Sequence, residues 1–393
     1  MGHRSSRHRF SSLDGSNRPP ISLQNFSIIR CIGRGAFGKV CIVQLRSTKK
    51  FYALKYMSKR RCIDKGVAAN VIRELSLLSQ ISHPFIVNLW FSFQDKDYMY
   101  MVSDLLLGGD LRFHLNQQGK FAEDRAKLYI CEISLAVEYL HKNHIIHRDI
   151  KPENILLDDQ GHAHLTDLNL ATKLEDDQLA TSFSGTRPYM APEIYGCAVG
   201  DVTGYNDRVD WWSLGVTFYE MLRGRTPFEL SSKYTPEQIL IVLTESCIAF
   251  PASWTSDLIS FLRKMMSLNP TKRMASIDDV KNHPYTERIN FEAVLQLKTA
   301  PVFVPCKEGL NCDPMHEIEE RILVSTPIHK RRHYANAHAN CASTPIGTNS
   351  ADHTPQSLAL HEISQAFIEY YRPEGVAKDL VNGSNKINNT AKN

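Results

Sequence analysis

The 393-residue chain lacks several features that would assign a protein to a simple class. Its nine cysteines are scattered and none forms a C-x-x-C pair, so neither a zinc site nor a disulfide framework is expected. No apolar run approaches the roughly 18 residues of a membrane span, and the N-terminus shows no secretory hydrophobic region. The net charge of +4 is too small to indicate a nucleic-acid partner. We therefore expect a globular protein of a reducing, cytoplasmic compartment.

The composition supports a sizeable core, because 42% of the residues are hydrophobic and 22% are charged. Residues 1–25, rich in Ser, Arg, Gly and Pro, predict a flexible basic leader. Residues 26–285 carry periodic apolar patterns and predict the folded domain. Residues 286–330 predict an extended segment, and the polar residues 331–393 predict a mostly disordered tail.

Two patterns divide the domain into a small lobe, residues 26–104, and a large lobe, residues 108–285. In the small lobe, five short apolar runs separated by turns predict strands, and "ANVIRELSLLSQI" predicts one main helix. In the large lobe the helical period dominates, and one predicted helix carries an apolar stripe of Ala126, Ile130, Ile133, Val137 and Leu140. We expect an α+β fold with a small five-stranded β lobe and a larger helical lobe.

The first residues, "MGHRSS", match the N-myristoylation pattern on Gly2, and Arg4, Arg7 and Arg9 follow closely. One acyl chain binds a membrane only marginally, so stable anchoring needs a second signal such as a basic cluster. We expect peripheral attachment to the inner leaflet of the membrane. The alternative is a basic leader that matches the pattern by chance.

The stretch "GRGAFGKV", residues 33–40, lies between two predicted strands. Its glycines would let the backbone approach a phosphate closely, although a structural hairpin explains such a pattern as well. A strand follows rather than a helix, and no G-K-[ST] is present, which argues against dinucleotide-binding and P-loop folds. On the next strand, a buried Lys55 would need an anionic partner, and Glu74 on the predicted helix can supply it.

The stretch "IIHRDIKPEN", residues 145–154, is more specific. Asp149 can accept a proton from a hydroxyl nucleophile, and Lys151 can neutralise a transferring phosphate. Asn154 offers a neutral oxygen, and Asp167 in "HLTDLNLATK" offers a carboxylate, which together suit Mg²⁺. This ordered set predicts phosphoryl-transfer chemistry.

Together with "GTRPYMAPE" and "DRVDWWSLGV", these motifs resemble the eukaryotic protein kinases over residues 26–285. "GGDLR" and "RGRTPF" are similar to the AGC group. "TDLN" and "LNCDPMHEIEE" resemble its YANK branch, the serine/threonine kinase 32 family. The resemblance implies a two-lobed kinase fold, ATP and Mg²⁺ as cofactors, and transfer of the γ-phosphate to protein Ser/Thr hydroxyls in signalling. "HRDIKPEN" is the serine/threonine form of its motif.

The resemblance also implies roles for single residues. Lys55 would hold the ATP phosphates and be fixed by Glu74. Asp149 would be the catalytic base, with Lys151 beside it, and Asn154 and Asp167 would hold Mg²⁺. The ATP site would comprise Ile32, Gly33, Arg34, Gly35, Ala36, Phe37, Gly38, Lys39, Val40, Ala53, Lys55, Asp104, Leu106 and Asp110, with Ser103 as a small gatekeeper.

Arg148 would bind a phosphate on the activation segment, residues 167–193. Ser182 occupies the position usually phosphorylated, and Thr181 and Ser184 are alternatives. Further contacts are expected to be structural. They are Thr186 with Asp149 and Lys151, Glu193 with Arg273, Asp210 with the backbone at His147 and Arg148, and an apolar column of Leu78, Leu89, His147 and Leu168.

Asn169 stands where such kinases usually have glycine. Because Asn is the residue after glycine that best tolerates positive φ, we expect a working site whose switching is altered. Two alternatives stay open. One is a catalytically weak pseudokinase or scaffold that binds nucleotide, and the other is a membrane-tethered adaptor. We expect a monomer.

The tail and the substrate site are less specific. Residues 286–330 resemble an AGC C-terminal extension, and "FIEYY", residues 367–371, resembles a hydrophobic motif that docks beside the Glu74 helix. An unrelated amphipathic segment is the alternative. Glu153 and Asp110 match two acids that read arginine in related kinases, but Ile241 replaces a third, so an arginine-rich consensus is doubtful. Thr326, Thr344 and Thr354 each precede proline and leave a turn-motif phosphosite unassigned.

Overall fold

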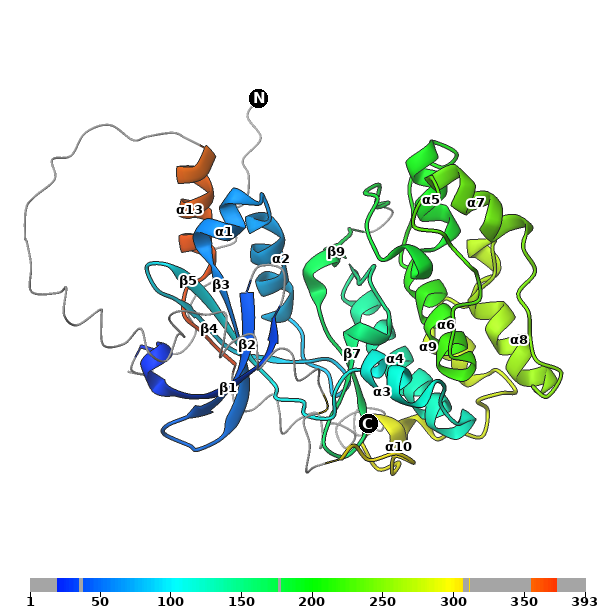
Figure 1. The fold of residues 1–393 in the computed structure, drawn as a ribbon, viewed down its shortest axis with the longest axis horizontal. Coiled ribbons are helices and arrows are strands. Elements are labelled where there is room, and N and C mark those ends of the chain that lie inside the picture. Colours follow the sequence, from blue (N-terminus) through cyan, green and yellow to red (C-terminus); the bar gives the residue numbers. More distant parts are fainter. Residues whose placement is uncertain (1–19, 35–37, 176–177, 307–310, 312–354, 373–393) are drawn as a thin grey trace, which may run out of the picture.

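The computed structural model describes residues 20–34, 38–175, 178–306, 311 and 355–372, which form two lobes (Figure 1). The lobe on the left of the view holds the main sheet, and the lobe on the right is helical. This arrangement confirms the expected α+β, two-lobed fold. The predictions for Gly2, Thr326, Thr344 and Thr354 lie outside the described residues.

The small lobe is an antiparallel sheet with two helices. Its strands are β1 (Phe26–Arg34), β2 (Gly38–Leu45), β3 (Phe51–Ser58), β4 (Leu89–Gln94) and β5 (Tyr98–Ser103). A short 3-10 turn, Leu23–Asn25, precedes β1, and the helices α1 (Lys59–Asp64) and α2 (Ala68–Leu78) follow β3. All five expected strands are present, and α2 is the expected main helix.

A sixth strand comes from the C-terminal tail. After helix α13 (Pro355–Ala366), strand β10 (Tyr370–Tyr371) pairs antiparallel with β4, so the sheet order is β1-β2-β3-β5-β4-β10. In Figure 1, α13 (orange) lies beside α1 and α2. The sequence predicted neither element, because a two-residue strand has no periodicity of its own and forms only where an open sheet edge accepts it.

The large lobe is built from helices with short strand pairs at its junction with the small lobe. The helices are α3 (Leu111–Gln118), α4 (Glu123–Lys142), α5 (Pro192–Val199), α6 (Arg208–Arg223), α7 (Pro236–Glu245), α8 (Ser256–Met265), α9 (Ile277–Lys281) and α10 (Phe291–Leu295). The strands are β6 (Ile145–Ile146), β7 (Ile155–Leu157), β8 (Ala163–Leu165) and β9 (Thr172–Lys173). Single 3-10 turns lie at Pro152–Asn154, Leu168–Leu170, Arg187–Tyr189 and Pro270–Lys272.

Helix α4 is the scaffold of this lobe. All five residues of its predicted apolar stripe are at most 1% exposed. Glu123 and Asp124 lie in its first turn and His141 and Lys142 in its last, which suits the helix dipole. Packed against α4, helix α6 buries Trp211 and Trp212 completely. The two short strand pairs, β6–β9 and β7–β8, then hold the loops that carry Asp149 and Asp167 at one edge of this rigid core. No helix among the described residues is long and apolar enough to cross a bilayer.

Candidate active site

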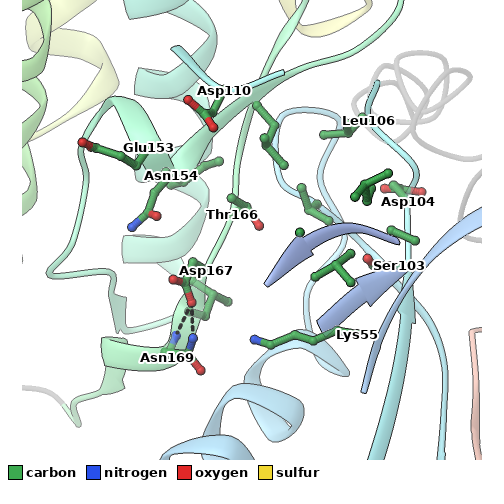
Figure 2. Close-up of a pocket in the computed structure, with 18 of the residues that line it drawn as sticks. Lys55, Ser103, Asp104, Leu106, Asp110, Glu153, Asn154, Thr166, Asp167 and Asn169 are labelled. Atoms are coloured by element: carbon green, nitrogen blue, oxygen red, sulfur yellow. Dashed lines mark hydrogen bonds between the residues drawn. The ribbon is translucent and has the colours of Figure 1, made fainter. Parts of the chain in front are cut away.

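A cavity of about 970 Å³ lies between the two lobes. The sheet contributes Gly33, Val40, Ala53, Lys55 and, at the end of β5, Ser103, and the segment after β5 contributes Asp104, Leu106 and Asp110. From the large lobe, Asn154 and Asp167 face them (Figure 2), and Leu156 completes this part of the lining. Of the predicted nucleotide residues, the following line this one cavity: Ile32, Gly33, Gly38, Val40, Ala53, Lys55, Asp104, Leu106 and Asp110.

The remaining predicted nucleotide residues are not among the described residues that line the cavity. Residues 35–37 and the side chain of Arg34 lie outside the described part of the chain. Lys39 is described and does not line the cavity, so its contact with the nucleotide stays a prediction. Strand side chains alternate between the two faces of a sheet, so Lys39 points away when Gly38 and Val40 point inward.

Gly38 is required by strand packing. A Cβ there would lie 2.1 Å from the carbonyl oxygen of Tyr56 on β3 and 2.7 Å from Cγ of Met57. At Gly33 the nearest atom to such a Cβ is Cβ of Val40, at an ordinary 3.7 Å. Gly38 is therefore needed for the packing of β2 against β3, in addition to its place in the cavity lining.

Lys55 and Glu74 form the predicted ion pair in the lining of the cavity. Nζ of Lys55, on β3, donates to both carboxylate oxygens of Glu74, on α2, at 2.8 and 2.9 Å. Burial lowers the pKa of Lys55, but the carboxylates of Glu74 and Asp167 outweigh it and leave the pKa raised. Burial raises the pKa of Glu74 and Lys55 opposes this, and the two short contacts favour the ionised pair.

Asp149 lies at the centre of a hydrogen-bond network that includes the cavity residue Asn154. Its Oδ2 accepts from Nζ of Lys151 at 2.7 Å and from Nδ2 of Asn154 at 2.9 Å. Its Oδ1 accepts from Oγ1 of Thr186 at 2.6 Å, and Lys151 also donates to Thr186 at 2.7 Å. Burial raises the pKa of Asp149, but the hydrogen bonds from Lys151 and Thr186 outweigh it and lower the pKa below its usual value. The carboxylate is therefore ionised, as a general base must be.

Asp210 stabilises the backbone of the loop that carries Asp149. The buried carboxylate of Asp210 accepts from the amide nitrogens of His147 and Arg148, both at 2.8 Å, and from Nε2 of His141 at 2.8 Å. The predicted contact of Asp210 is thus confirmed. It stabilises Arg148 in a left-handed conformation with φ of 67°.

Asp167 also has a left-handed backbone, with φ of 66°. Its Oδ1 accepts from the amide nitrogen of Asn169 at 3.4 Å and, in a shorter contact, from the side-chain Nδ2 of Asn169 (Figure 2). Asn169 does not use its tolerance of positive φ in this conformation, because it lies in the 3-10 turn Leu168–Leu170. Its side chain acts on the neighbouring carboxylate instead.

The cation-binding capacity of the site follows from its oxygen atoms. Asn154 donates from Nδ2 to the carbonyl oxygen and to Oδ2 of Asp149, at 2.8 and 2.9 Å, which directs its own carbonyl oxygen elsewhere. With Asp167 this makes a set of hard oxygen donors, which fits Mg²⁺. Among the described residues no group of three or more His, Cys, Asp and Glu side chains could hold a metal alone. A cation here would therefore need nucleotide phosphates and water as further ligands.

The activation segment contacts Arg148 through Ser182. The guanidinium of Arg148 donates to Oγ of Ser182, to the hydroxyl of Tyr205 at 3.3 Å and to the carbonyl of Leu170 at 2.7 Å. Ser184 donates to Ser182 at 3.2 Å, so the three side chains form one cluster. Further along, the predicted pair of Glu193 and Arg273 is confirmed, with contacts of 2.5 and 3.0 Å.

The two acids considered for substrate reading already have partners. Glu153 accepts from Arg112 at 2.8 Å, and Arg112 also donates to Glu220 at 2.9 Å. Oδ1 of Asp110 accepts from the amide of Phe113 at 2.7 Å and caps α3. Ile241 on α7 is 52% exposed. An incoming basic side chain would compete with these internal contacts.

The tail contributes Asn311 and Arg372, for which the sequence predicted no role of their own, and Phe367, which belongs to the motif predicted to dock beside the Glu74 helix. Asn311 lines the cavity and donates to the carbonyl oxygens of Leu107 and Cys306, both at 2.9 Å. Phe367 lies in a buried cluster with residues of α2 and the sheet. Buried Arg372 donates to the carbonyl oxygens of Leu89, at 2.6 Å, and Ile81, at 2.9 Å. No sequence motif indicates this role of Arg372. It follows from the pairing of β10 with β4, because Arg372 comes directly after β10.

Comparison with known proteins agrees with this geometry. The protein kinase domain family matches residues 26–286. Serine/threonine-protein kinase 32B of Homo sapiens is 49% identical over 81% of this chain and 78% of its own length. Serine/threonine-protein kinase 32C of Mus musculus is 48% identical over 83% of this chain and 68% of its own length. The chain belongs to the protein kinase family.

The similarity to kinases 32B and 32C shows which type of protein kinase this chain is. At nearly half identity over most of the chain, kinases 32B and 32C support serine/threonine protein kinase activity. A more distant relative, serine/threonine-protein kinase AtPK2/AtPK19 of Arabidopsis thaliana, is 38% identical over 74% of this chain and 61% of its own length. The protein is therefore a serine/threonine protein kinase related to kinases 32B and 32C.

Proposed function

We propose that the cleft catalyses Mg²⁺-dependent, in-line transfer of the γ-phosphoryl group of ATP to Ser and Thr hydroxyls of protein substrates. The observation that carries the proposal is the Lys55–Glu74 pair in the cavity together with the ionised Asp149 network, which is joined to the cavity lining through Asn154. Such a site works by positioning and by electrostatic stabilisation of the transition state. Both functions need charged groups held in advance of the reaction, and these two networks hold them.

Each residue has a role that follows from its contacts. Lys55, held by Glu74, binds the phosphates, and Asp149 takes the proton of the substrate hydroxyl. Lys151, which bonds both Asp149 and Thr186, lies where it can neutralise charge on the transferred group. Asn154 and Asp167 are the protein ligands for Mg²⁺. When bound, the cation neutralises the phosphate oxygens as charge develops on them.

The competing function is a scaffold that binds nucleotide without turnover. Asp149→Asn keeps the shape of the side chain but cannot take the proton, so it is expected to lose phosphorylation of a generic protein substrate while keeping ATP-induced thermal stabilisation. Asp167→Asn is expected to lose the Mg²⁺-dependent part of that stabilisation. The scaffold function would be supported if wild-type, full-length protein phosphorylated at Ser182 bound Mg·ATP without turnover.

We also propose that Asn169 positions Asp167 for the cation. A donor on Oδ1 leaves Oδ2 available to a cation and stabilises the left-handed backbone of Asp167. In Asn169→Gly, the Mg²⁺ concentration that half-saturates binding of a fluorescent ATP analogue is expected to rise about 2- to 12-fold, the effect of one ordinary hydrogen bond. Asn169→Asp, which removes the donor and adds like charge, is expected to raise it further. An unchanged or lower value in Asn169→Gly would contradict this role.

Ser182 is proposed as the activating phosphorylation site. Its Oγ already contacts Arg148, so a phosphate there would form charge-assisted hydrogen bonds with the guanidinium. Ser182→Ala is expected to lower activity, and Thr181→Ala is the control on the adjacent residue. Equal activity of Ser182→Ala and wild type, after treatment with the same activating lysate, would contradict the assignment.

For the whole protein we propose a cytoplasmic monomer attached to the inner leaflet through acylated Gly2 and the basic leader. The support is the sequence pattern alone. Co-expression with an N-myristoyltransferase should add the acyl group to wild type and not to Gly2→Ala. The acylated form alone should then sediment with anionic vesicles. Light scattering after gel filtration would test the oligomeric state.

A further inference from the structure

Two cysteines face each other across the first two strands of the sheet. Cys31 on β1 and Cys41 on β2 are direct cross-strand partners, and their sulfur atoms lie 2.7 Å apart. Cys41 is fully buried and Cys31 is 9% exposed. Within the described residues no other two cysteine sulfurs are recorded in contact. Cys62 and Cys131 are buried separately, and Cys247 and Cys306 are exposed.

The position of the pair relative to the cavity is defined by strand alternation. The neighbouring residues Ile32 and Val40 line the cavity. Cys31 and Cys41 point to the opposite face, into an apolar cluster with Ile21 and Phe26. A bond between the two sulfurs would therefore join β1 and β2, the strands that form the roof of the cavity, on the face that points away from the cavity.

The geometry already approaches that of a disulfide. A disulfide bond is about 2.03–2.05 Å long, so the sulfurs need to close by about 0.7 Å, which small side-chain rotations supply. The strand pairing sets the separation of the two backbones before any reaction. Because β1 is the edge strand of the sheet, local opening of this hairpin can admit a small oxidant to Cys31.

We propose that Cys31 and Cys41 are a reversible oxidation site that forms an intrachain disulfide. With hydrogen peroxide as oxidant, the thiolate of Cys31 attacks one peroxide oxygen and breaks the O–O bond, which gives a sulfenic acid and hydroxide. The hydroxide takes up the proton that the Cys31 thiol had released and becomes water. The thiol of Cys41 then attacks this sulfur, which forms the S–S bond and expels a second water. Two thiols and one hydrogen peroxide thus yield one disulfide and two waters, and a dithiol reductant reverses the reaction by exchange.

The disulfide is expected to stiffen the roof of the cavity. It closes a short loop that contains the glycine-rich stretch, residues 33–40, and so restricts the unfolded chain more than the folded one. For a loop of this length the expected rise of the thermal midpoint is on the order of 5 °C. The rise should disappear when dithiothreitol is added.

The test uses the full-length protein with matched variants. Wild type, Cys31→Ser, Cys41→Ser and the exposed control Cys247→Ser are treated with increasing hydrogen peroxide. They are then alkylated, digested without reduction and mapped by mass spectrometry. The proposal predicts a peptide pair linked through Cys31 and Cys41 in wild type and Cys247→Ser, together with the reversible thermal shift. Both serine variants should lack the linked pair and the shift.

Several results would overturn the proposal. One is the absence of the linked peptide at peroxide concentrations that already oxidise Cys247 in wild type. Another is linkage of Cys31 or Cys41 to a different cysteine in the folded monomer. Because Cys41→Ser places a hydroxyl in an apolar cluster and can unfold the lobe, Cys41→Ala is the second variant. A thermal shift that persists in folded Cys41→Ala would also overturn the proposal.

Discussion

Phe367 anchors the C-terminal segment, and truncating it is expected to undock that segment from the small lobe. Its side chain is 1% exposed and lies in a cluster with Ile363, Val71 and Leu75. Replacing a buried Phe with Ala costs about 3–5 kcal/mol in a packed core. We take the lower end, because the β10 pairing and the hydrogen bonds of Arg372 stay in place. A loss of about 3 kcal/mol shifts the docking equilibrium about a hundredfold.

Undocking should also reduce catalysis, because α13 packs on α2 and α2 carries Glu74. Coupling of about 0.5–2 kcal/mol between the two sites corresponds to a loss of about 2- to 30-fold in kcat/KM. The assays are hydrogen exchange across residues 355–372 and steady-state phosphorylation of one peptide. Ile368→Ala is the matched control, since Ile368 lies in the same segment and is 58% exposed. Full exchange protection in Phe367→Ala, or equal losses in both variants, would refute the reasoning.

Three further predictions concern the cleft and the lobes. Glu74→Gln should lower kcat/KM about 10- to 100-fold, since a hydrogen bond to a charged group is worth about 1.5–3 kcal/mol, and activity within twofold of wild type would contradict the role of the pair. Gly38→Ala should lower the free energy of unfolding by about 1–3 kcal/mol in urea titration, because its Cβ would meet the Tyr56 carbonyl at 2.1 Å, whereas Gly33→Ala, with its nearest atom at 3.7 Å, should be tolerated. Burial lowers the pKa of His162, but Glu132, hydrogen-bonded at 2.6 Å, and Asp158 outweigh it and raise the pKa. The stability that this pair contributes is therefore fully present below about pH 6.5, the unfolded pKa, and is lost as the pH rises through the folded pKa. In wild type the thermal midpoint should fall as the pH rises from the unfolded to the folded pKa of His162. The same dependence of the thermal midpoint on pH in His162→Gln would contradict this role.

The catalytic core was predictable because its motifs are local in sequence and chemically specific. Asp149, Lys151 and Asn154 lie within six residues of each other, and their side-chain types alone indicate proton transfer, charge neutralisation and metal binding. Lys55 and Glu74 come from different elements, yet the cost of burying an unpaired charge predicts that they meet. The apolar stripe of α4 was predictable for a similar reason, since helical periodicity depends only on neighbouring residues.

The orientation of individual side chains could not be predicted from the sequence, because it depends on the folded chain. Lys39 belongs to the glycine-rich stretch but faces away from the cavity, because strand alternation turns it outward. The tolerance of Asn169 for positive φ suggested altered switching, whereas in the structure the left-handed backbone belongs to Asp167 and the Asn169 side chain bonds its carboxylate. Glu153 and Asp110 are acids suited to substrate reading by type, but Arg112 and the α3 backbone already engage them.

The chemistry of this protein can therefore be predicted from its residues, whereas its long-range contacts follow from the tertiary fold. Residue type and short-range spacing specify a proton acceptor, a phosphate-binding lysine and metal ligands, because these properties belong to single side chains. Contacts between Arg372 and Leu89, or between Cys31 and Cys41, carry no such local signal. They exist because a sheet edge accepts a distant strand and because pairing register sets two side chains opposite each other.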